Sequence, residues 1–533
     1  MNKILPTFCV LFLLIAFIPQ LVAQNLTIPG ISEITSGNVG YIQKENKTEA
    51  YYFLSITGER TSKDDELMDH LLTIVDVNLH PILHYSIRLG EKSFIKGIAQ
   101  QDDHFGIVFA DEEEERQWLE ILDRAGNKLR STELVFPNYN ENKIPEDHHL
   151  TEQAPIAGVM GGFIVHQHTA PNFRIKGWRE HQVLFFSLED PAKDWASSKT
   201  QLEDRDYWGG HLWSNDTLVL SNQIGQGFNR IGNYTVIQSQ VLAHDLRTGE
   251  LLFTYNIRSA NEAPRLAWAT DDGFAVVGLV YGGENKAQLV SNSYSVYEAR
   301  FNTTGRHLKT YTMDYYRDLP ALIGKEIQDE KAGIEGIGYL YFHQINRLPN
   351  GQLILNLESF DLEFRGHIND GLVCIMESDL TLKSVERIPK KPHGVFYNIN
   401  ARKIEYRMTT HPTSWEKPYA IDHGHGNYLV PSKVKKINEP FEPVPRLSNK
   451  YFDFIFQTID DTGVVTFSYF DQEKTDESKT NIRLVSLANE EFSEQEIALP
   501  HGERKYFIWP NTGGRITVLT QNKKENTLEV VVI

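Results

Sequence analysis

The sequence predicts an all-β protein built from one repeated unit of four strands, on three observations. A turn followed by an apolar strand, as in LPNGQLILNLES from Leu348, recurs along the chain. The apolar strands of these recurrences begin at Tyr52, Phe105, Phe163, Leu218, Phe274, Leu353, Val464 and Ile516. Most intervals between them are in the fifties, and the intervening segments are short, rich in β-branched and aromatic residues, and punctuated by Gly, Asn and Asp. A strand-rich repeat of this length is typical of a β-propeller, whose unit is a blade of four antiparallel strands.

The predicted units share one internal order of strands. In the fifth unit the strands are PRLAWAT, GFAVVGLVY, YSVYEARFN and HLKTYTMDY, with the turn TTGR before the last. In the second unit they are SFIKGIAQ, HFGIVFAD, RQWLEILD and KLRSTELVF. We count about eight blades, with seven as the alternative. Two stacked β-sandwiches would also give short strands, but they impose no shared period.

The last unit, RITVLTQ followed by TLEVVVI, lacks a fourth strand. Either LTIPGISEITSG or VGYIQ near the N-terminus could supply it and close the ring, which would conceal edge strands prone to aggregation. In its repeats the chain resembles secreted β-propeller proteins. Trp-Asp dipeptides and regularly spaced Gly pairs are missing from the sequence, so the resemblance is to no narrower family.

Residues 1–23 have the features of a secretory signal peptide. Lys3 precedes the apolar run FCVLFLLIAFI, and the small residue Ala23 precedes the expected cleavage site. A membrane anchor is the alternative, but this run is short for a membrane span. We therefore expect an exported product, periplasmic or extracellular, in which residues 24–533 form a single propeller domain.

Two repeat intervals are longer than the others and predict insertions. In the first, at about 316–340, Leu319, Leu322, Ile323 and Ile327 fall at helical spacing and predict a short helix around 317–330. The second, at about 391–450, is rich in Pro, Lys, His and Tyr. We favour an insertion there over a degenerate ninth blade.

Charge and cysteine content exclude some classes of function. The net charge of −18 disfavours binding to nucleic acid or to anionic lipid. Only Cys374 would remain after cleavage, so the fold must rely on its hydrophobic core rather than on disulfides. Cys374 lies in the apolar segment GLVCIMES, which predicts a buried, unreactive thiol. The sequence identifies no cofactor, and it leaves the oligomeric state open.

One face of the predicted propeller carries longer loops than the other. If the strands of a blade are named A to D from the axis outward, the B–C and D–A connections share one face because neighbouring strands are antiparallel. C–D turns such as DRAGN are tight, whereas B–C loops such as HTAPNFRIKGWRE are long. The long D–A segments 191–212, 316–340 and 391–450 would share the B–C face. Functional insertions gather on loops held by a rigid scaffold, so this loop-rich face is the candidate site.

Three B–C loops, in blades three, four and six, have similar chemistry. They carry Phe173, Arg174, Trp178 and Arg179, then Phe228 and Arg230, then Phe364, Arg365 and His367. Arginine forms bidentate bonds with carboxylate or sulfate, and aromatic rings stack on sugars. These residues predict a site for a glycan, peptide or protein ligand with anionic groups. Alternatively, each Arg pairs with a nearby carboxylate and each Phe packs beneath its own loop.

Acidic and histidine residues form weaker candidates for acid–base or metal chemistry. They are Asp204, Asp206 and His211 before blade four, and Asp422, His423 and His425 in the second insertion. His423 and His425 are two residues apart, as are His166 and His168, and histidines with this spacing could ligate zinc. No third ligand has useful spacing, so we predict no metal site. The sequence lacks G-x-S-x-G and H-E-x-x-H. We expect a non-catalytic binding or assembly protein of the cell envelope; the alternative is a carbohydrate-active hydrolase or lyase.

Overall fold

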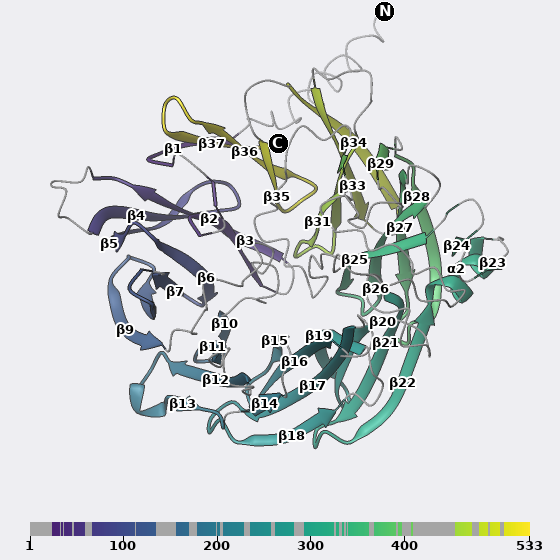
Figure 1. Ribbon diagram of the computed structural model, residues 1–533, viewed down its shortest axis with the longest axis horizontal. Helices are drawn as coiled ribbons and strands as arrows, with labels where there is room; N and C mark the ends of the chain where they lie inside the picture. Colours follow the sequence, from purple (N-terminus) through teal and green to yellow (C-terminus); the bar gives the residue numbers. More distant parts are fainter. Residues whose placement is uncertain are drawn as a thin grey trace, which may run out of the picture.

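The computed structural model is a propeller of eight β-sheets arranged around a central axis (Figure 1). Residues 24–533 are described except for 32–33, 36, 45–46, 59–66, 112, 135–155, 170–178, 199, 203–205, 229–234, 257–261, 282–292, 324–326, 330–332, 335–336, 338, 362–366, 391–392, 397–406, 409–452, 472–478, 489–490 and 501–505. The eight-bladed, almost all-β fold confirms the architecture predicted from the repeat.

Each blade is an antiparallel sheet. In blades one to seven the strands follow sequence order from the axis outward, and in blade eight the outermost strand comes from the N-terminus. The strands of blades one to four are β2 Val39–Lys44, β3 Lys47–Ile56, β4 Leu67–Asp76 and β5 Pro81–Gly90; β6 Ser93–Gln101, β7 His104–Asp111, β8 Arg116–Asp123 and β9 Lys128–Leu134; β10 Ile156–Val159, β11 Gly162–Thr169, β12 Arg179–Ser187, β13 Trp195–Ala196 and β14 Thr200–Leu202; and β15 Asp206–Ser214, β16 Leu218–Phe228, β17 Thr235–Asp245 and β18 Leu251–Asn256.

Blades five to eight follow the same scheme. Their strands are β19 Glu262–Thr270, β20 Gly273–Tyr281, β21 Ser293–Asn302 and β22 His307–Asp314; β25 Tyr339–Arg347, β26 Leu353–Asp361, β27 His367–Met376 and β28 Leu382–Ile388; β31 Phe454–Ile459, β32 Val465–Phe470, β33 Lys479–Ala488 and β34 Glu491–Pro500; and β35 Tyr506–Pro510, β36 Ile516–Asn522, β37 Thr527–Val532 and β1 Gln24–Pro29.

The ring is closed by the N-terminal strand. β1 pairs antiparallel with β37 over its whole length, from Gln24 opposite Val532 to Pro29 opposite Thr527, and is the outer strand of blade eight. Of the two predicted candidates, LTIPGISEITSG supplies the closing strand through its first four residues, Leu26–Pro29, whereas VGYIQ lies in the inner strand of blade one. Across the adjoining seam between blades eight and one, the Trp509 ring stacks on Tyr51, with 5.7 Å between ring centroids.

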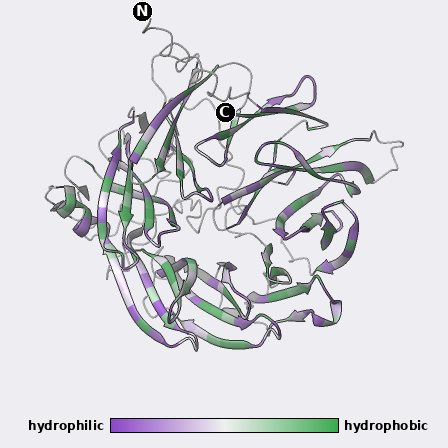
Figure 2. Cartoon of the chain, turned by 180° about the vertical axis from the view of Figure 1, so that it is seen from behind, coloured by the Kyte–Doolittle hydropathy of each residue, from purple (hydrophilic) through white to green (hydrophobic). Residues whose placement is uncertain are grey.

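The hydrophobic core is divided into layers between blades. Eight apolar clusters occur in the described residues, and each joins two neighbouring blades. Middle strands such as β7 and β32 face a neighbour on both sides, which explains why they read as unbroken apolar runs rather than as alternating ones. Outer strands such as β22 are largely exposed, and Figure 2 shows more hydrophilic residues along the outer rim than in the middle strands.

Tight turns on the face of the A–B and C–D connections have a common chemistry. In the turn after β8, the Asp123 carboxylate accepts a hydrogen bond from the Asn127 N–H at 2.8 Å, and Gly126 has a φ of +83°. Asn302 and Gly305 repeat this arrangement after β21. Glycine adopts left-handed φ without strain, and the carboxylate or amide oxygen satisfies backbone N–H groups, so these connections stay short.

The connections outside this scheme only partly match the sequence predictions. The helix α2 spans Tyr315–Ile323, and β23 (Ile327–Asp329) then pairs with β24 (Gly333–Ile334), so the predicted helix around 317–330 starts earlier and ends sooner.

Segment 191–212 is not a D–A loop, which corrects the sequence interpretation. It contains the 3-10 helix Pro191–Lys193, then β13 and β14, and then the start of β15. β13 and β14 both pair with β12, so together they take the place of an outer strand. The outer strand was missed because it is split into two short pieces, neither of which has a recognisable apolar pattern.

Candidate functional site

The propeller topology places the three predicted ligand-binding loops on one face. The loops follow the ends of B strands at Thr169, Phe228 and Asp361, in blades three, four and six. Because strands keep the same order and antiparallel alternation in every blade, all B-strand ends share the face that carries the D–A connections. The face that sequence analysis named as loop-rich is therefore the face on which these loops begin and end.

The predicted ligand-binding side chains themselves are not described. Arg179, Phe228 and His367 lie at the ends of β12, β16 and β27, where only their backbone positions are given. The others lie outside the described residues: Phe173, Arg174, Trp178, Arg230, Phe364 and Arg365. Their role in binding stays a prediction.

The predicted acid–base residues are described only in part. Asp204, Asp422, His423 and His425 lie outside the described residues. Asp206 and His211 both lie in β15, and the side chain of His211 is described. Its Nδ1 atom is buried with no hydrogen-bond partner among the described residues, and burial lowers the pKa of His211 to about 4. His211 is thus neutral at neutral pH, and such a pKa suits a general base poorly.

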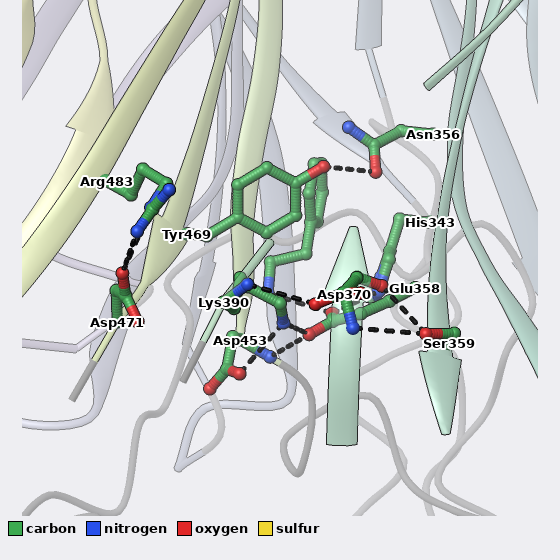
Figure 3. A network of polar contacts seen from close by, with 11 residues as sticks. His343, Asn356, Glu358, Ser359, Asp370, Lys390, Asp453, Tyr469, Asp471 and Arg483 are labelled. Carbon is green, nitrogen blue, oxygen red and sulfur yellow. Dashed lines mark hydrogen bonds and ion pairs between the residues drawn. The ribbon is translucent and has the colours of Figure 1, made fainter. Parts of the chain in front are cut away.

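A buried ionic cluster lies on the loop-rich side of blades six and seven, and we call it the root cluster. It consists of His343 in β25, Glu358 in β26, Lys390 after β28 and Asp453 before β31 (Figure 3). The side chains of Glu358 and Lys390 are fully buried, and those of His343 and Asp453 are 3% and 4% exposed.

Glu358 is the centre of the root cluster, because its carboxylate accepts hydrogen bonds from Lys390, His343 and two backbone N–H groups. Lys390 forms an ion pair with Glu358 Oε1, and His343 Nε2 lies 2.8 Å from Oε2. The backbone N–H groups of Asp453 and Phe454 donate to the two oxygens at 3.0 and 3.1 Å. Lys390 also donates to Asp453 Oδ2 at 2.9 Å. Each buried charge therefore has a charged partner, as burial of ions requires.

Electrostatics keep Glu358 and Lys390 ionised despite burial. Burial alone would raise the pKa of Glu358, but the charge of Lys390 and the His343 hydrogen bond outweigh it and hold the pKa below its ordinary value. Burial alone would lower the pKa of Lys390, but Asp453 and Glu358 raise it above its ordinary value. Glu358 and Lys390 consequently remain a charged pair in the interior.

Neighbouring side chains hold the root cluster in place. The His343 ring stacks on Phe454, with 4.5 Å between centroids, and the Lys390 ammonium lies 5.4 Å from the Tyr469 ring. The Lys390 N–H donates to Asp370 at 3.1 Å, and Asp370 pairs in turn with Arg387. Lys390 is therefore anchored by both its side chain and its backbone.

The position of the root cluster links it to the predicted insertion. Lys390 is the last residue before the predicted insertion 391–450, and Asp453 is the first described residue after this insertion. Within the insertion, the structure describes only two short strands, β29 His393–Phe396 and β30 Arg407–Met408. The side chains of Lys390 and Asp453 meet at 2.9 Å. The cluster thus fastens both ends of the insertion to Glu358 of blade six.

Sequence reasoning missed the root cluster. Its members are spread over more than a hundred residues and form no motif. The one local signal is a charged residue at a strand position where an apolar residue is expected, as Glu358 in LILNLES.

A second buried polar group lies in blades three and four and includes His166, which sequence analysis considered as a zinc ligand. His166 Nδ1 lies 3.1 Å from His181 Nε2, and His181 Nδ1 lies 2.6 Å from the side-chain nitrogen of Gln223. The side chain of His168 is outside the described part of the chain. Among described residues, no three His, Cys, Asp or Glu side chains are placed to hold a metal ion.

One further sequence prediction can be compared with the structure. Cys374 is buried in β27, and burial raises the pKa of its thiol, so it is an unreactive core residue as expected. Among the described residues, no helix is both long enough and apolar enough to cross a membrane.

Comparison with known proteins defines a family. Residues 1–366 match the family described as "Family of unknown function (DUF6770)". This is more than half of the chain, so the protein belongs to this family. No curated protein matches the sequence significantly.

Several solved structures match this chain at low similarity. The β-propeller domain of the Trilobed protease from Pyrococcus furiosus is 9% identical, with a TM-score of 0.36, and covers 87% of this chain and 99% of its own. Quinohemoprotein alcohol dehydrogenase from Comamonas testosteroni is 10% identical, with a TM-score of 0.36, and the coverages are 96% and 76%. Prolyl oligopeptidase B from Galerina marginata is 7% identical, with a TM-score of 0.36; 89% of this chain is covered, but only 55% of that enzyme. Likeness at this level supports no inference about ligand or reaction.

Proposed function

We propose that the protein is an exported binding protein that holds an anionic glycan or peptide on its loop-rich face. One observation carries the proposal. The topology brings the B–C strand ends of blades three, four and six to the same face as the root cluster, where the ends of the 391–450 insertion are fastened. Loops that start from a rigid ring at one face are suited to surround a single ligand.

The chemistry of these loops favours an anionic ligand. Arg174, Arg179, Arg230 and Arg365 are concentrated in three short segments of a chain whose net charge is −18. Arginine binds carboxylate and sulfate groups through paired N–H donors, and the neighbouring Phe173, Trp178, Phe228 and Phe364 offer stacking surfaces. Acidic sugars and acidic peptides combine the two features that such loops recognise.

The root cluster and the one described candidate for acid–base chemistry, His211, favour binding over catalysis. Glu358, Lys390 and Asp453 are buried and compensate one another, so they are unavailable to a substrate. His211 has a pKa of about 4, which is too low for an efficient general acid or base at neutral pH. These observations support the binding hypothesis over the hydrolase or lyase alternative.

Export is the second part of the proposal. The signal-peptide pattern ends at Ala23, and the described part of β1 is Gln24–Pro29, so cleavage at the expected site would keep all of these residues in the mature chain. A location in the periplasm or outside the cell would expose the loop-rich face to envelope glycans and peptides.

A screen of the purified protein tests the proposed function. The protein is applied to an array of uronic-acid and sulfated oligosaccharides together with glutamate-rich peptides, and both retention and cleavage are scored. We expect retention of anionic members that weakens as salt is raised, without new cleavage products. Release of shortened oligosaccharides, or retention of neutral glycans alone, would contradict the proposal.

A further inference from the structure

A layer of buried polar side chains lies between blades six and seven and continues from the root cluster. Asn356 and Glu358 are two residues apart on β26, so their side chains point to the same side of the sheet, toward blade seven. The Tyr469 hydroxyl, from β32 of blade seven, donates to Asn356 Oδ1 at 2.8 Å (Figure 3). Because β26 runs toward the loop-rich face, Asn356 lies deeper in the interface between the blades than Glu358.

Amide side chains from both blades form this layer, and we call it the amide layer. On blade six, Gln344 is paired with Asn356 across the β25–β26 ladder, and Asn346 is two residues further along β25. These three side chains therefore lie on one side of the sheet. On blade seven, Gln457 Nε2 donates to Asn346 Oδ1 at 2.9 Å, and the Gln457 backbone carbonyl accepts from Gln344 Nε2 at 3.1 Å. Hydrogen bonds of amide side chains thus join the two blades.

Three atoms of the amide layer have no hydrogen-bond partner among the described residues. They are Asn346 Nδ2, Asn356 Nδ2 and Gln457 Oε1. Asn346 and Asn356 are 0% exposed and Gln457 is 1% exposed, so bulk solvent does not reach them. A buried donor or acceptor without a hydrogen bond destabilises a protein, and native structures rarely retain one. Three such atoms in one layer indicate a bound group that supplies the hydrogen bonds.

The chemistry of these three atoms selects the bound group. Two amide N–H donors and one carbonyl oxygen require a ligand that accepts two hydrogen bonds and donates one. A metal cation cannot accept from N–H groups, and a simple anion cannot donate to a carbonyl oxygen. Water does both, and about three hydrogen bonds are usual for a buried water molecule. We infer that one water molecule is bound between blades six and seven, held by Asn346 Nδ2, Asn356 Nδ2 and Gln457 Oε1.

The geometry of the amide layer suits a single bridging molecule. The amides of Asn346 and Gln457 share a hydrogen bond, so their two other polar atoms are also near one another. A water can bridge atoms up to about 5.8 Å apart, which is twice an ordinary hydrogen-bond length. Asn356 is the diagonal neighbour of Asn346 on the β25–β26 ladder, at a separation of about 7–8 Å that side chains reach across.

The choice of water does not depend on which way the amides are oriented. If the oxygen and nitrogen of Asn346 and Gln457 are both exchanged, their mutual hydrogen bond is kept with its direction reversed. Asn346 then offers the acceptor and Gln457 the donor, so water fits in either case. The bound water would link both inner strands of blade six to the inner strand of blade seven, next to the root cluster.

A crystal structure of the purified protein, at a resolution that shows ordered water, tests the inference directly. We expect one peak of electron density within about 3.2 Å of all three atoms. Amide groups that instead bond directly to one another, with no peak between them, would overturn the inference. A peak with the short contacts of a metal ion would overturn it too.

Oxygen-17 relaxation dispersion, which detects long-lived internal water in solution, gives a second measurement. Asn346→Leu with Gln457→Met replaces both members of the amide pair by apolar side chains of similar size, a change that need not disturb folding. We expect this variant to lose the signal of one water molecule. Ile459→Leu is the matched control, because it repacks an apolar residue between the same two blades and should keep the full signal. An unchanged signal in the double variant, or an equal loss in the control, would contradict the assignment of the water to this site.

Discussion

Lys390 shows most clearly how single residues are constrained in this fold. It is fully buried between two carboxylates, and its removal would leave Glu358 and Asp453 without their cation. Breaking a buried ion pair on one side costs about 3–5 kcal/mol, because the remaining charge stays desolvated. We expect the Lys390→Met variant to lose free energy of unfolding of this order, as measured by urea denaturation.

An exposed ion pair provides the control for this measurement. Arg88 lies 3.4 Å from Asp69, and both side chains are more than half exposed. Surface pairs contribute about 0–1 kcal/mol, so Arg88→Met should change little. Equal, small losses in the two variants would show that the root cluster does not hold the fold.

Glu358 should make the protein sensitive to acid. Its folded pKa lies below the ordinary 4.5, so its stabilising contribution is complete above that pH and is lost as the pH falls through the folded pKa. We expect the wild type to lose stability more steeply below pH 4.5 than Glu358→Gln, which has no carboxyl to protonate there. Parallel curves from chemical denaturation in this range would refute the assignment.

His211 should act in a different pH window. Its pKa is lowered from 6.5 to about 4 by burial, so the unfolded chain takes up a proton that the folded chain refuses. Stability should therefore fall as the pH decreases from 6.5 to about 4, and His211→Gln should flatten this fall. Melting temperatures recorded across this window test the expectation, and an unchanged slope would mean that His211 is more solvated than its position indicates.

At the residue level, sequence reasoning recognised side chains only where a local pattern marked them. Cys374 was assigned correctly because its neighbours are all apolar. Glu358, Lys390 and Asp453 were not found, because blade packing alone brings them together. Ion pairs between residues that are distant in the chain depend on tertiary contacts, which cannot be predicted from the pattern of a single sequence.

Elements differed in how well the sequence predicted them. Helix α2 was expected near the place where it occurs, but the expected C-terminal part was wrong: Ile327 lies in strand β23. Its apolar spacing suits a helix, yet Gly324 follows the last helical residue, and glycine commonly ends helices. The helical spacing of apolar residues in the sequence therefore continues for one turn beyond Ile323, where the helix ends.

The insertion after β28 should be separable from the propeller. Both of its ends are fastened by the root cluster, so residues 411–450 should be replaceable by a short Gly/Ser linker. The entropy cost of closing a loop changes by only about 0.6 kcal/mol for each twofold change in its length, and shortening the loop lowers this cost. We expect a melting temperature close to that of the wild type, followed by circular dichroism; failure to fold would show that the segment belongs to the core.

The whole molecule depends on closure between its ends. Without β1, the edge of β37 would be open and could pair with another chain. We expect deletion of residues 24–29, with the leader joined to Gly30, to lower the melting temperature and cause association, as seen by light scattering. The paired control, Asn25→Ala with Thr27→Ala, changes only exposed positions of β1 and should stay monodisperse to the same degree as the wild type. A well-behaved deletion variant would contradict the importance of closure.

The overall fold was the part most open to sequence reasoning, since similar strand pairs recur along the chain, mostly at intervals in the fifties, and such a repeat is typical of a propeller. The face of the candidate site followed from the same topology. The ligand did not, because the repeat determines where loops begin and end but says nothing of how their side chains converge.

The central claim is that the arginine-bearing loops of the loop-rich face bind an anionic ligand, and a double variant tests it most directly. Arg174 and Arg365 belong to loops of blades three and six, and a hydrogen bond to a charged group contributes about 1.5–3 kcal/mol. Affinity of the wild type and of Arg174→Ala with Arg365→Ala is measured by calorimetry, using the strongest anionic oligosaccharide or peptide from the screen, alongside both melting temperatures. We predict binding weakened by at least about tenfold with nearly the same melting temperature. Unchanged affinity, or a marked loss of stability, would show that these arginines fasten loops to the scaffold instead of binding a ligand.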